Sequence, residues 1–190
     1  MKKSILVFIL VILPSLSFGF ERFNAVMKYD PHFSKYTKRY FGPGFDWRYF
    51  KAQAIAESHL KSDAVSHVGA KGVMQIMPRT FKEIKTRNPE IKGAANNPRW
   101  NIAAGIYYDR QIWLIFKAKR PFQDKLSFMF GAYNAGKGNI IRAQRISKRE
   151  GKNPNLWRSI EVTLPRVTGR SSNQTIEYVK KIKDIREALK

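Results

Sequence analysis

The stretch DWRYFKAQAIAESHL, residues 46–60, decides how the middle of the chain folds. Apolar side chains such as Phe50 and Ala54 recur in it at helical spacing, which predicts one helix. Asp46 stands where an N-cap residue belongs. The helix carries Glu57, seven residues after Phe50 and three after Ala54, so this carboxyl group lies on a partly apolar face.

An apolar environment changes what Glu57 can do. Desolvation raises the pKa of a carboxyl group, and an acid that stays protonated near neutral pH is what cleavage of a glycosidic bond requires. The alternative is an ordinary surface glutamate paired with Lys61 at i,i+4, a contact worth about 0.2–0.5 kcal/mol. Position on the helix alone favours this second interpretation.

The segments after residue 60 indicate further helices and no regular sheet. Ser62–Gly72 holds two glycines and predicts a loop. Asn97 followed by Pro98 predicts a helix start. Later helices are expected in the apolar segment Gln123–Tyr133, which NAG at 134–136 would end, in the basic segment Ile140–Arg149, and in a closing segment with Ser172 as its cap and Ile176, Val179, Ile182 and Ile185 on one stripe. Only Ile160–Val167 could hold a short strand or an extended loop, so the predicted fold class is mainly α.

The N-terminal segment has the layout of a secretory signal peptide over residues 1–19. Lys2 and Lys3 precede an apolar run at 5–13, and Pro14 and small residues follow it. A membrane anchor is the alternative, but the run is shorter than the roughly 20 residues that cross a bilayer. We therefore expect cleavage after Gly19 and an exported product in the periplasm or cell envelope.

The composition limits how the exported chain could be held and what it could bind. It has no cysteine, which excludes disulfides and a lipoprotein anchor. Residues 20–45 are aromatic and basic and predict an irregular lead-in with at most one short helix, before a single domain at 46–190. Loss of the signal peptide would lower the formal net charge from +22 to +20, because that segment holds two lysines and no acid. An anionic envelope surface is the expected partner, and export makes nucleic acid an unexpected one.

Three sequence blocks carry a resemblance to a known family. They are ESHL at 57–60, SHVGAKGVMQIMP at 66–78 and AYNAG at 132–136, with NIAAG at 101–105 and the pair Tyr178-Val179 as flanks. In this order and at these separations they resemble the soluble lytic transglycosylases of the lysozyme superfamily. The resemblance covers roughly Trp47 to Ile182. It implies a lysozyme-like helical domain whose cleft binds peptidoglycan glycan strands, and a catalytic role for Glu57.

The same resemblance implies the residues that contact saccharide. By their place in the motifs they are Ser66, Gln75, Met77, Tyr133 and Asn134. Each has a structural alternative: Ser66 and Asn134 could stabilise turns, Met77 could belong to the core, and Tyr133 could pack with its hydroxyl satisfied. The chain departs from the family at Gln174-Thr175, where Glu-Thr is usual, which puts the ligand contact from that position in doubt.

The motifs contain one acid where most glycosidases need two carboxylates. Asp63 lies in a polar loop and Glu161 lies outside the motifs, so both are expected to be surface charges. The resemblance implies a reaction in which the substrate supplies the second group. Glu57 protonates the glycosidic oxygen and then takes the proton from the muramic C6 hydroxyl, which gives a 1,6-anhydro product without water.

Other chemistries lack their residues. Three histidines, no cysteine and no His-Glu-x-x-His pattern make a metal site unexpected, and nothing indicates a cofactor. Ser58 beside His59 has no nucleophile elbow around it. Two other classes stay open at this point: a wall-binding protein that has lost turnover, and a basic protein that acts on membranes or nucleic acid.

Overall fold

The computed structural model describes residues 19–190, so the predicted signal peptide lies outside the described residues except for Gly19. The described chain is built from helices: η2 (Glu21–Ala25), α1 (Asp30–Phe41), α2 (Arg48–Ser58), α3 (Pro78–Arg87), α4 (Pro98–Ile115), α5 (Phe122–Ala135), α6 (Lys137–Arg149), α7 (Trp157–Thr163), α8 (Pro165–Thr168) and α9 (Ser171–Ala188). Over this range extended pairing is limited to isolated bridges, Val65 with Lys71 and Lys71 with Ile76. The predicted mainly α fold is confirmed.

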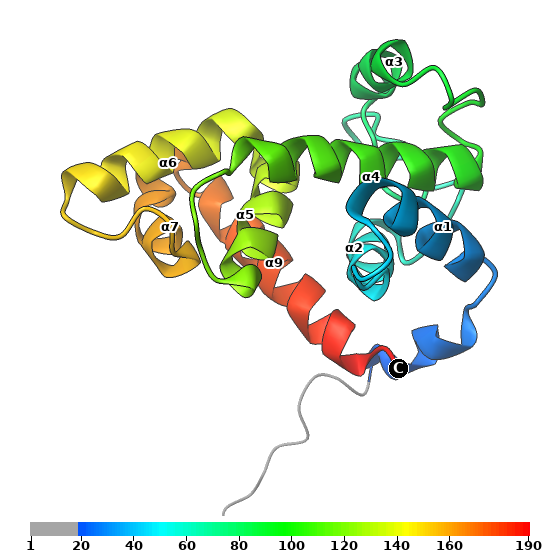
Figure 1. Ribbon diagram of the computed structural model, residues 1–190, viewed down its shortest axis with the longest axis horizontal. Helices are drawn as coiled ribbons and strands as arrows, with labels where there is room; N and C mark the ends of the chain where they lie inside the picture. Colours follow the sequence, from blue (N-terminus) through cyan, green and yellow to red (C-terminus); the bar gives the residue numbers. More distant parts are fainter. Residues whose placement is uncertain (1–18) are drawn as a thin grey trace, which may run out of the picture.

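The core forms where α2, α4, α5 and α9 cross (Figure 1). Helix α9 runs diagonally across the molecule and packs against both α2 and α5, while α4 packs against α1 and α5. Large apolar side chains from these helices are fully buried, among them Phe50, Phe128 and Ile182. Helices α6 and α7 lie at one end of the long axis and α1 near the other. In the described residues, no helix has the length and apolar character that a membrane span requires.

The segment 20–45 differs from the irregular lead-in expected for it. It contains η2 and the twelve-residue helix α1, which packs against α4. Pro31 lies in the first turn of α1, where a missing backbone N–H costs no hydrogen bond. Phe33 and Tyr36 are buried one turn apart, so α1 contributes to the core and the compact unit begins before residue 46.

The segment 160–167 is also helical, which corrects the alternative of a strand or extended loop. Ile160, Thr163 and Leu164 are buried, and their spacing is that of a helix face. The Thr163 hydroxyl donates to the Ala143 carbonyl on α6 at 3.0 Å. Burial against α6 therefore selects the helix over the apolar alternation that Ile160, Val162 and Leu164 give the sequence.

Two predicted caps need correction. The α2 helix begins at Arg48 with Trp47 in the cap position, but the Asp46 carboxylate still accepts the Arg48 backbone N–H at 3.1 Å. The α9 helix begins at Ser171, and Ser172 is a buried helical residue whose hydroxyl donates to the Gly169 carbonyl at 2.7 Å. Asp46 thus accepts a backbone N–H at the start of α2 although it lies one residue before the N-cap position. Ser172 does not cap α9.

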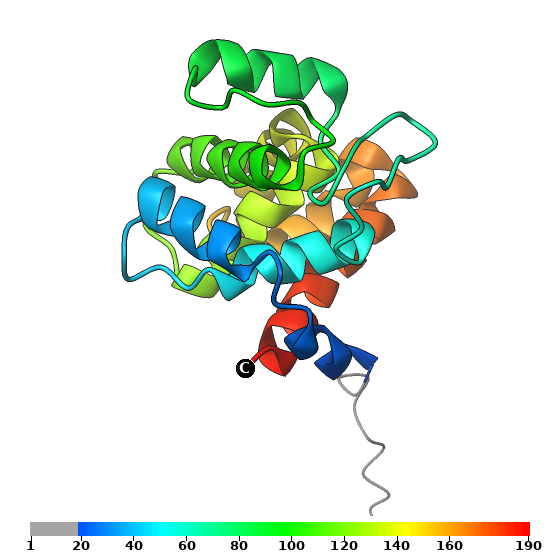
Figure 2. The same cartoon turned by 90° about the vertical axis from the view of Figure 1, so that its right-hand side faces the viewer.

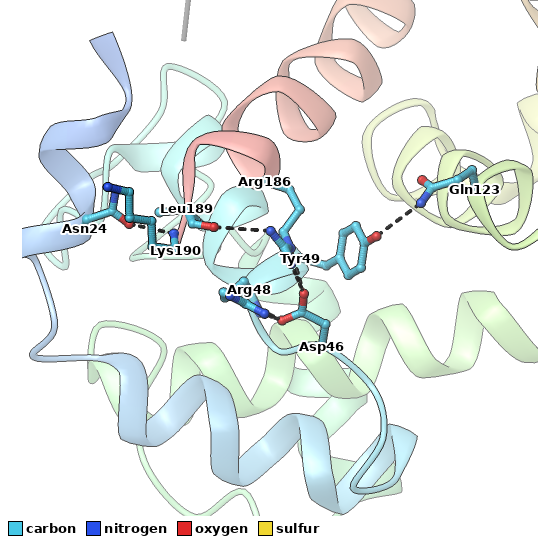
Figure 3. A network of polar contacts seen from close by, with 8 residues as sticks. All are labelled: Asn24, Asp46, Arg48, Tyr49, Gln123, Arg186, Leu189 and Lys190. Carbon is cyan, nitrogen blue, oxygen red and sulfur yellow. Dashed lines mark hydrogen bonds and ion pairs between the residues drawn. The ribbon is translucent and has the colours of Figure 1, made fainter. Parts of the chain in front are cut away.

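A polar network ties the two ends of the described chain to the start of α2 (Figure 3). Arg186 on α9 donates to Asp46, with 2.7 Å between Nε and Oδ2, and Arg48 binds the other oxygen of the same carboxylate at 2.9 Å. Burial would raise the pKa of Asp46, but the bonds from Arg48 and Arg186 outweigh it and lower that pKa. Asn24 also accepts the Lys190 backbone N–H at 2.9 Å, so η2 lies beside the end of α9 (Figure 2).

Candidate active site

Glu57 lies in the last turn of α2, just before the chain leaves the helix. The helix ends because His59 and Leu60 both adopt left-handed backbone conformations, with φ of 53° and 64°. Ser58 is buried, and its hydroxyl donates to the Val73 carbonyl at 2.8 Å. The end of α2 is therefore fixed to the loop that follows it, and Glu57 is held at this junction.

Tyr178 on α9 is the direct partner of Glu57. Its hydroxyl donates to the Glu57 carboxyl, with 2.5 Å between the two oxygens. Burial raises the pKa of Glu57 to about 7, and the Tyr178 hydrogen bond and the positive charge of Lys181 only partly oppose that rise. A surface glutamate at this position was expected to pair with Lys61. Among the described residues no ion pair joins Glu57 to Lys61.

The loop that follows α2 is anchored on α4. Asn101 accepts the Met74 backbone N–H at 2.7 Å and donates to the Lys71 and Ala95 carbonyls at 2.9 and 2.7 Å. Gly105 lies against the Met74 side chain so closely that a Cβ would come within 2.8 Å of it. The block NIAAG thus supplies an amide that holds the loop backbone and a glycine that lets Met74 pack.

The structure brings three of the predicted saccharide contacts together. Gln75, Met77 and Tyr133 line one small cavity of about 90 Å³ together with Tyr108. The Tyr133 hydroxyl donates to the Met74 carbonyl at 2.7 Å, and its ring meets Tyr108 edge-on at 5.4 Å. Burial raises the pKa of Tyr133 well above its usual value, and the nearby Glu57 carboxyl adds to the rise. Tyr133, which lines this cavity, is thus close enough to Glu57 for the carboxyl charge to affect its pKa.

The side chains that line the cavity differ in exposure and in how many of their polar atoms already have hydrogen-bond partners in the protein. Met77 is 41% exposed, which excludes the core position considered for it. Gln75 has φ of 44°, and its side-chain amide nitrogen donates to the Ala64 and Gly72 carbonyls at 3.1 and 2.9 Å. The loop therefore positions Gln75. Its NH₂ group already has two acceptors, while no donor from the described residues binds its side-chain carbonyl oxygen.

Ser66 and Asn134 already have structural contacts. The Ser66 hydroxyl accepts the Ala70 backbone N–H at 3.0 Å, which stabilises the turn containing Gly69. The Asn134 side-chain oxygen accepts the Thr175 hydroxyl at 2.8 Å and so connects α5 to α9. Gln174, at the position where the sequence departs from the family, is exposed on α9. Saccharide contact by Ser66 and Asn134 stays a prediction.

Sequence reasoning missed a second carboxyl group near Glu57. Asp109 on α4 is fully buried, and Gln53 on α2 donates to it with 3.4 Å between Nε2 and Oδ1. Burial raises the pKa of Asp109 well above its usual value, and the Glu57 carboxyl contributes to the rise. A signal was present, because Asp109 lies three residues from both Ile106 and Ile112, on the apolar stripe of the predicted helix.

The family model of the transglycosylase SLT domain matches residues 34–156, more than half of the chain.

The chain belongs to the transglycosylase SLT domain family.

The solved structures and relatives of this SLT chain extend the match. It is 30% identical over 142 residues to membrane-bound lytic murein transglycosylase F of Vibrio campbellii, covering 75% of this chain and 24% of the relative. The 70 kDa soluble lytic transglycosylase of Escherichia coli superposes with a TM-score of 0.62 at 25% identity, over 85% of this chain and 24% of that one. An inactive mutant of the lytic transglycosylase Slt from Pseudomonas aeruginosa gives 0.65 at 26% identity, over 84% and 23%. The SLT chain thus spans about a quarter of the length of these proteins, and the resemblance inferred from its motifs is confirmed.

Proposed function

We propose that this SLT chain is an exported peptidoglycan lytic transglycosylase. It cleaves the β-1,4 bond between N-acetylmuramic acid and N-acetylglucosamine without water and leaves a 1,6-anhydromuramyl end. One observation carries the proposal. Glu57 is a partly buried acid whose pKa is raised to about 7, and it lies at the end of α2, just before the loop that contains the family motif. Relatives named lytic murein transglycosylases support the substrate and the reaction class.

In the first step Glu57 acts as a general acid. A carboxyl group with a pKa near 7 keeps a useful fraction of its proton at neutral pH and passes it to the glycosidic oxygen as the C1–O bond breaks. The muramic acetamido group stabilises C1 during this step. The Tyr178 hydroxyl, 2.5 Å from the carboxyl, then stabilises the carboxylate that remains.

In the second step the Glu57 carboxylate takes the proton of the C6 hydroxyl while the C6 oxygen bonds to C1. The proton that left Glu57 is thereby replaced, and no water is consumed. The position of the second carboxyl supports this route over one with an enzyme nucleophile, because Asp109 is fully buried and its contact is with Gln53. An acid without solvent exposure cannot reach C1 of a sugar.

The glycan strand would lie over the cavity beside Glu57. Gln75, Met77 and Tyr133 offer an amide oxygen, an exposed thioether and an aromatic ring, which suit the polar and apolar faces of a sugar. Ser66 and Asn134 complete the proposed contact set from the turn and from α5.

The proposed setting is the bacterial envelope, where murein is found. The chain has no cysteine for a lipid anchor. The charge of +20 that would remain after loss of the signal peptide suits an anionic partner, and export favours an envelope surface over a nucleic acid. The described residues contain no group of three His, Asp or Glu side chains arranged to hold a metal. We expect activity without cofactor or metal.

Digestion of purified murein tests the reaction. The expected soluble products are muropeptides lighter by one water than those from lysozyme, and a chelator should leave their yield unchanged. Reducing muramic ends would mean hydrolysis and would overturn the transglycosylase assignment. Tight binding to murein without any soluble product would identify a wall-binding protein instead.

A further inference from the structure

A buried acid and amide meet beneath the catalytic turn. Gln53 and Asp109 both have no solvent exposure, and the Gln53 amide nitrogen lies 3.4 Å from Asp109 Oδ1. The remaining oxygens of this pair, Gln53 Oε1 and Asp109 Oδ2, have no hydrogen-bond partner. Among the ion pairs of residues 19–190, none includes Asp109.

One proton accounts for both unpartnered oxygens. If Asp109 were ionised, its Oδ2 and the Gln53 Oε1 would both be acceptors without a donor, in a place where each unsatisfied polar atom costs about 1–3 kcal/mol. A proton on Oδ2 turns Asp109 into a donor toward Gln53 Oε1, while the Gln53 amide donates to Oδ1. The acid and the amide then form a closed pair with two hydrogen bonds. Burial and the neighbouring Glu57 carboxyl both raise the pKa of Asp109, in agreement with this protonation.

The pair is coupled to the catalytic acid through α2. Gln53 precedes Glu57 by four residues, so the two side chains lie one turn apart on the same face of the helix. In the proposed reaction Glu57 becomes negatively charged once in every turnover. A second negative charge in the same buried region would oppose that step, and among the described residues only the cation of Lys181 acts on Glu57.

We propose that Asp109 is a positioning residue that is protonated at neutral pH, pairs with the Gln53 amide beneath Glu57, and leaves Glu57 as the one carboxyl group there that changes charge during turnover. The proposal rests on the catalytic role given to Glu57 above. The paired Asp109 and Gln53 hold α2 and α4 together at the level of the catalytic turn, where a small displacement of the acid lowers the rate.

Infrared spectroscopy tests the proton without depending on turnover. The Glu57→Gln variant removes the other carboxyl group whose pKa is raised. A carbonyl band of a protonated carboxylic acid at pH 8 in this variant therefore reports Asp109. We expect that band in Glu57→Gln and its loss in the double variant with Asp109→Asn. If Glu57→Gln shows no protonated carboxyl at pH 8, Asp109 is ionised and the proposal is wrong, whatever the products of the enzyme are.

Kinetics test the positioning role. Asp109→Asn can form the same two hydrogen bonds with Gln53, so it should keep kcat within a few-fold of the wild-type value and leave the basic limb of the kcat/KM profile in place. Asp109→Leu has a similar shape without the bonds, and kcat should fall about tenfold or more with KM little changed. A basic limb that moves to lower pH in Asp109→Asn would show that a charge has been removed and would contradict the proposal. Equal losses in both variants would contradict the role of the pair.

Discussion

The surroundings of Glu57 and the groove at the far end of the molecule differ in the charged groups that they contain. Near Glu57 there are two carboxyl groups with raised pKa values, Glu57 itself being partly buried and Asp109 fully buried. Among the described residues, Lys181 is the cation whose charge lowers the pKa of the proposed acid. Between α6 and α8 a groove of about 720 Å³ is lined by Ile146, Val167 and the cations Arg142, Arg145, Lys148, Arg149 and Arg166.

The difference shows that proton donation by Glu57 and attraction to an anionic wall need different surroundings. A cation beside Glu57 would stabilise its ionised form and remove the proton that the first chemical step needs. Attraction to an anionic wall needs many exposed cations and no fixed geometry. The five cations of the groove are not among the charges that shift the pKa of Glu57, and the larger groove is not the cavity proposed to bind saccharide.

The largest expected effect comes from removing the acid. Glu57→Gln keeps the shape of the side chain but can neither donate an acidic proton nor recover one. Because Glu57 serves both steps, release of soluble muropeptides should fall by more than the roughly 10⁴-fold upper range for one acid–base group. The measurement is product formation from purified murein, with murein binding as the control for a folded cleft. An active glutamine variant would overturn the assignment of Glu57.

The same variant should change how stability depends on pH. The folded-state pKa of Glu57, about 7, lies above its ordinary value of 4.5, so the wild-type gains nothing and loses nothing below about pH 4.5. Between pH 4.5 and 7 the unfolded chain releases this proton before the folded chain does, and the wild-type loses stability. Glu57→Gln escapes that loss and should be more stable than the wild-type above pH 7, by at most about 3 kcal/mol. Unfolding in urea at pH 4.5 and pH 8 measures it, and an equal difference at both pH values would be inconsistent with a raised pKa.

Removing the Tyr178 hydroxyl should sharpen the comparison further. The hydrogen bond from Tyr178 lowers the pKa of Glu57. Tyr178→Phe should therefore raise that pKa by about one unit, taking the lower end of the roughly 1.5–3 kcal/mol for a bond to a charged group. The basic limb of the kcat/KM profile should move from near pH 7 toward pH 8. Tyr36→Phe is the matched control, because its hydroxyl accepts from Arg99 away from the site. A limb that stays in place in Tyr178→Phe would mean that another group sets it.

The smallest effect is expected in the basic groove. Arg145→Glu with Arg149→Glu should slow attachment to intact murein a few-fold at low salt and leave turnover of a short soluble glycan unchanged. The control makes the same charge change on α1 with Lys35→Glu and Lys38→Glu. High salt should abolish the difference, since the Debye length is about 8 Å at physiological ionic strength. Equal slowing by both double variants would show that the net charge of the protein sets the rate of attachment, and that the position of the cations in the groove does not.

Helices with a clear apolar period were predictable, and those that depend on packing were not. The segment 46–60 and the start at Asn97-Pro98 appear as expected, the latter with Asn97 accepting the Trp100 backbone N–H at 3.3 Å. Helix α1 is more extensive than the one short helix allowed for residues 20–45, because its proline and aromatic residues suggest an irregular segment until burial against α4 is known. The same holds for 160–167, where contact with α6 selects a helix.

The candidate site shows the same division. Glu57 could be found from helical position and motif, because both are local properties of the sequence. The hydrogen bond to Tyr178 and the pairing of Gln53 with Asp109 depend on the registers of α2 against α9 and α4, which join positions 121 and 56 residues apart. Helical period places a side chain on a face but does not say which residue of another helix it meets.

The separation between Glu57 and Tyr178 also bears on when the protein can become active during synthesis. The bond joins residues 121 positions apart, and such distant contacts form only after the intervening chain has been brought together. Until α9 has left the ribosome and packed against α2, Glu57 lacks its partner and much of the burial that raises its pKa, and it behaves as an ordinary ionised glutamate. The sequence motif is therefore present in the nascent chain before Glu57 has its raised pKa, which depends on the packing of α9 against α2.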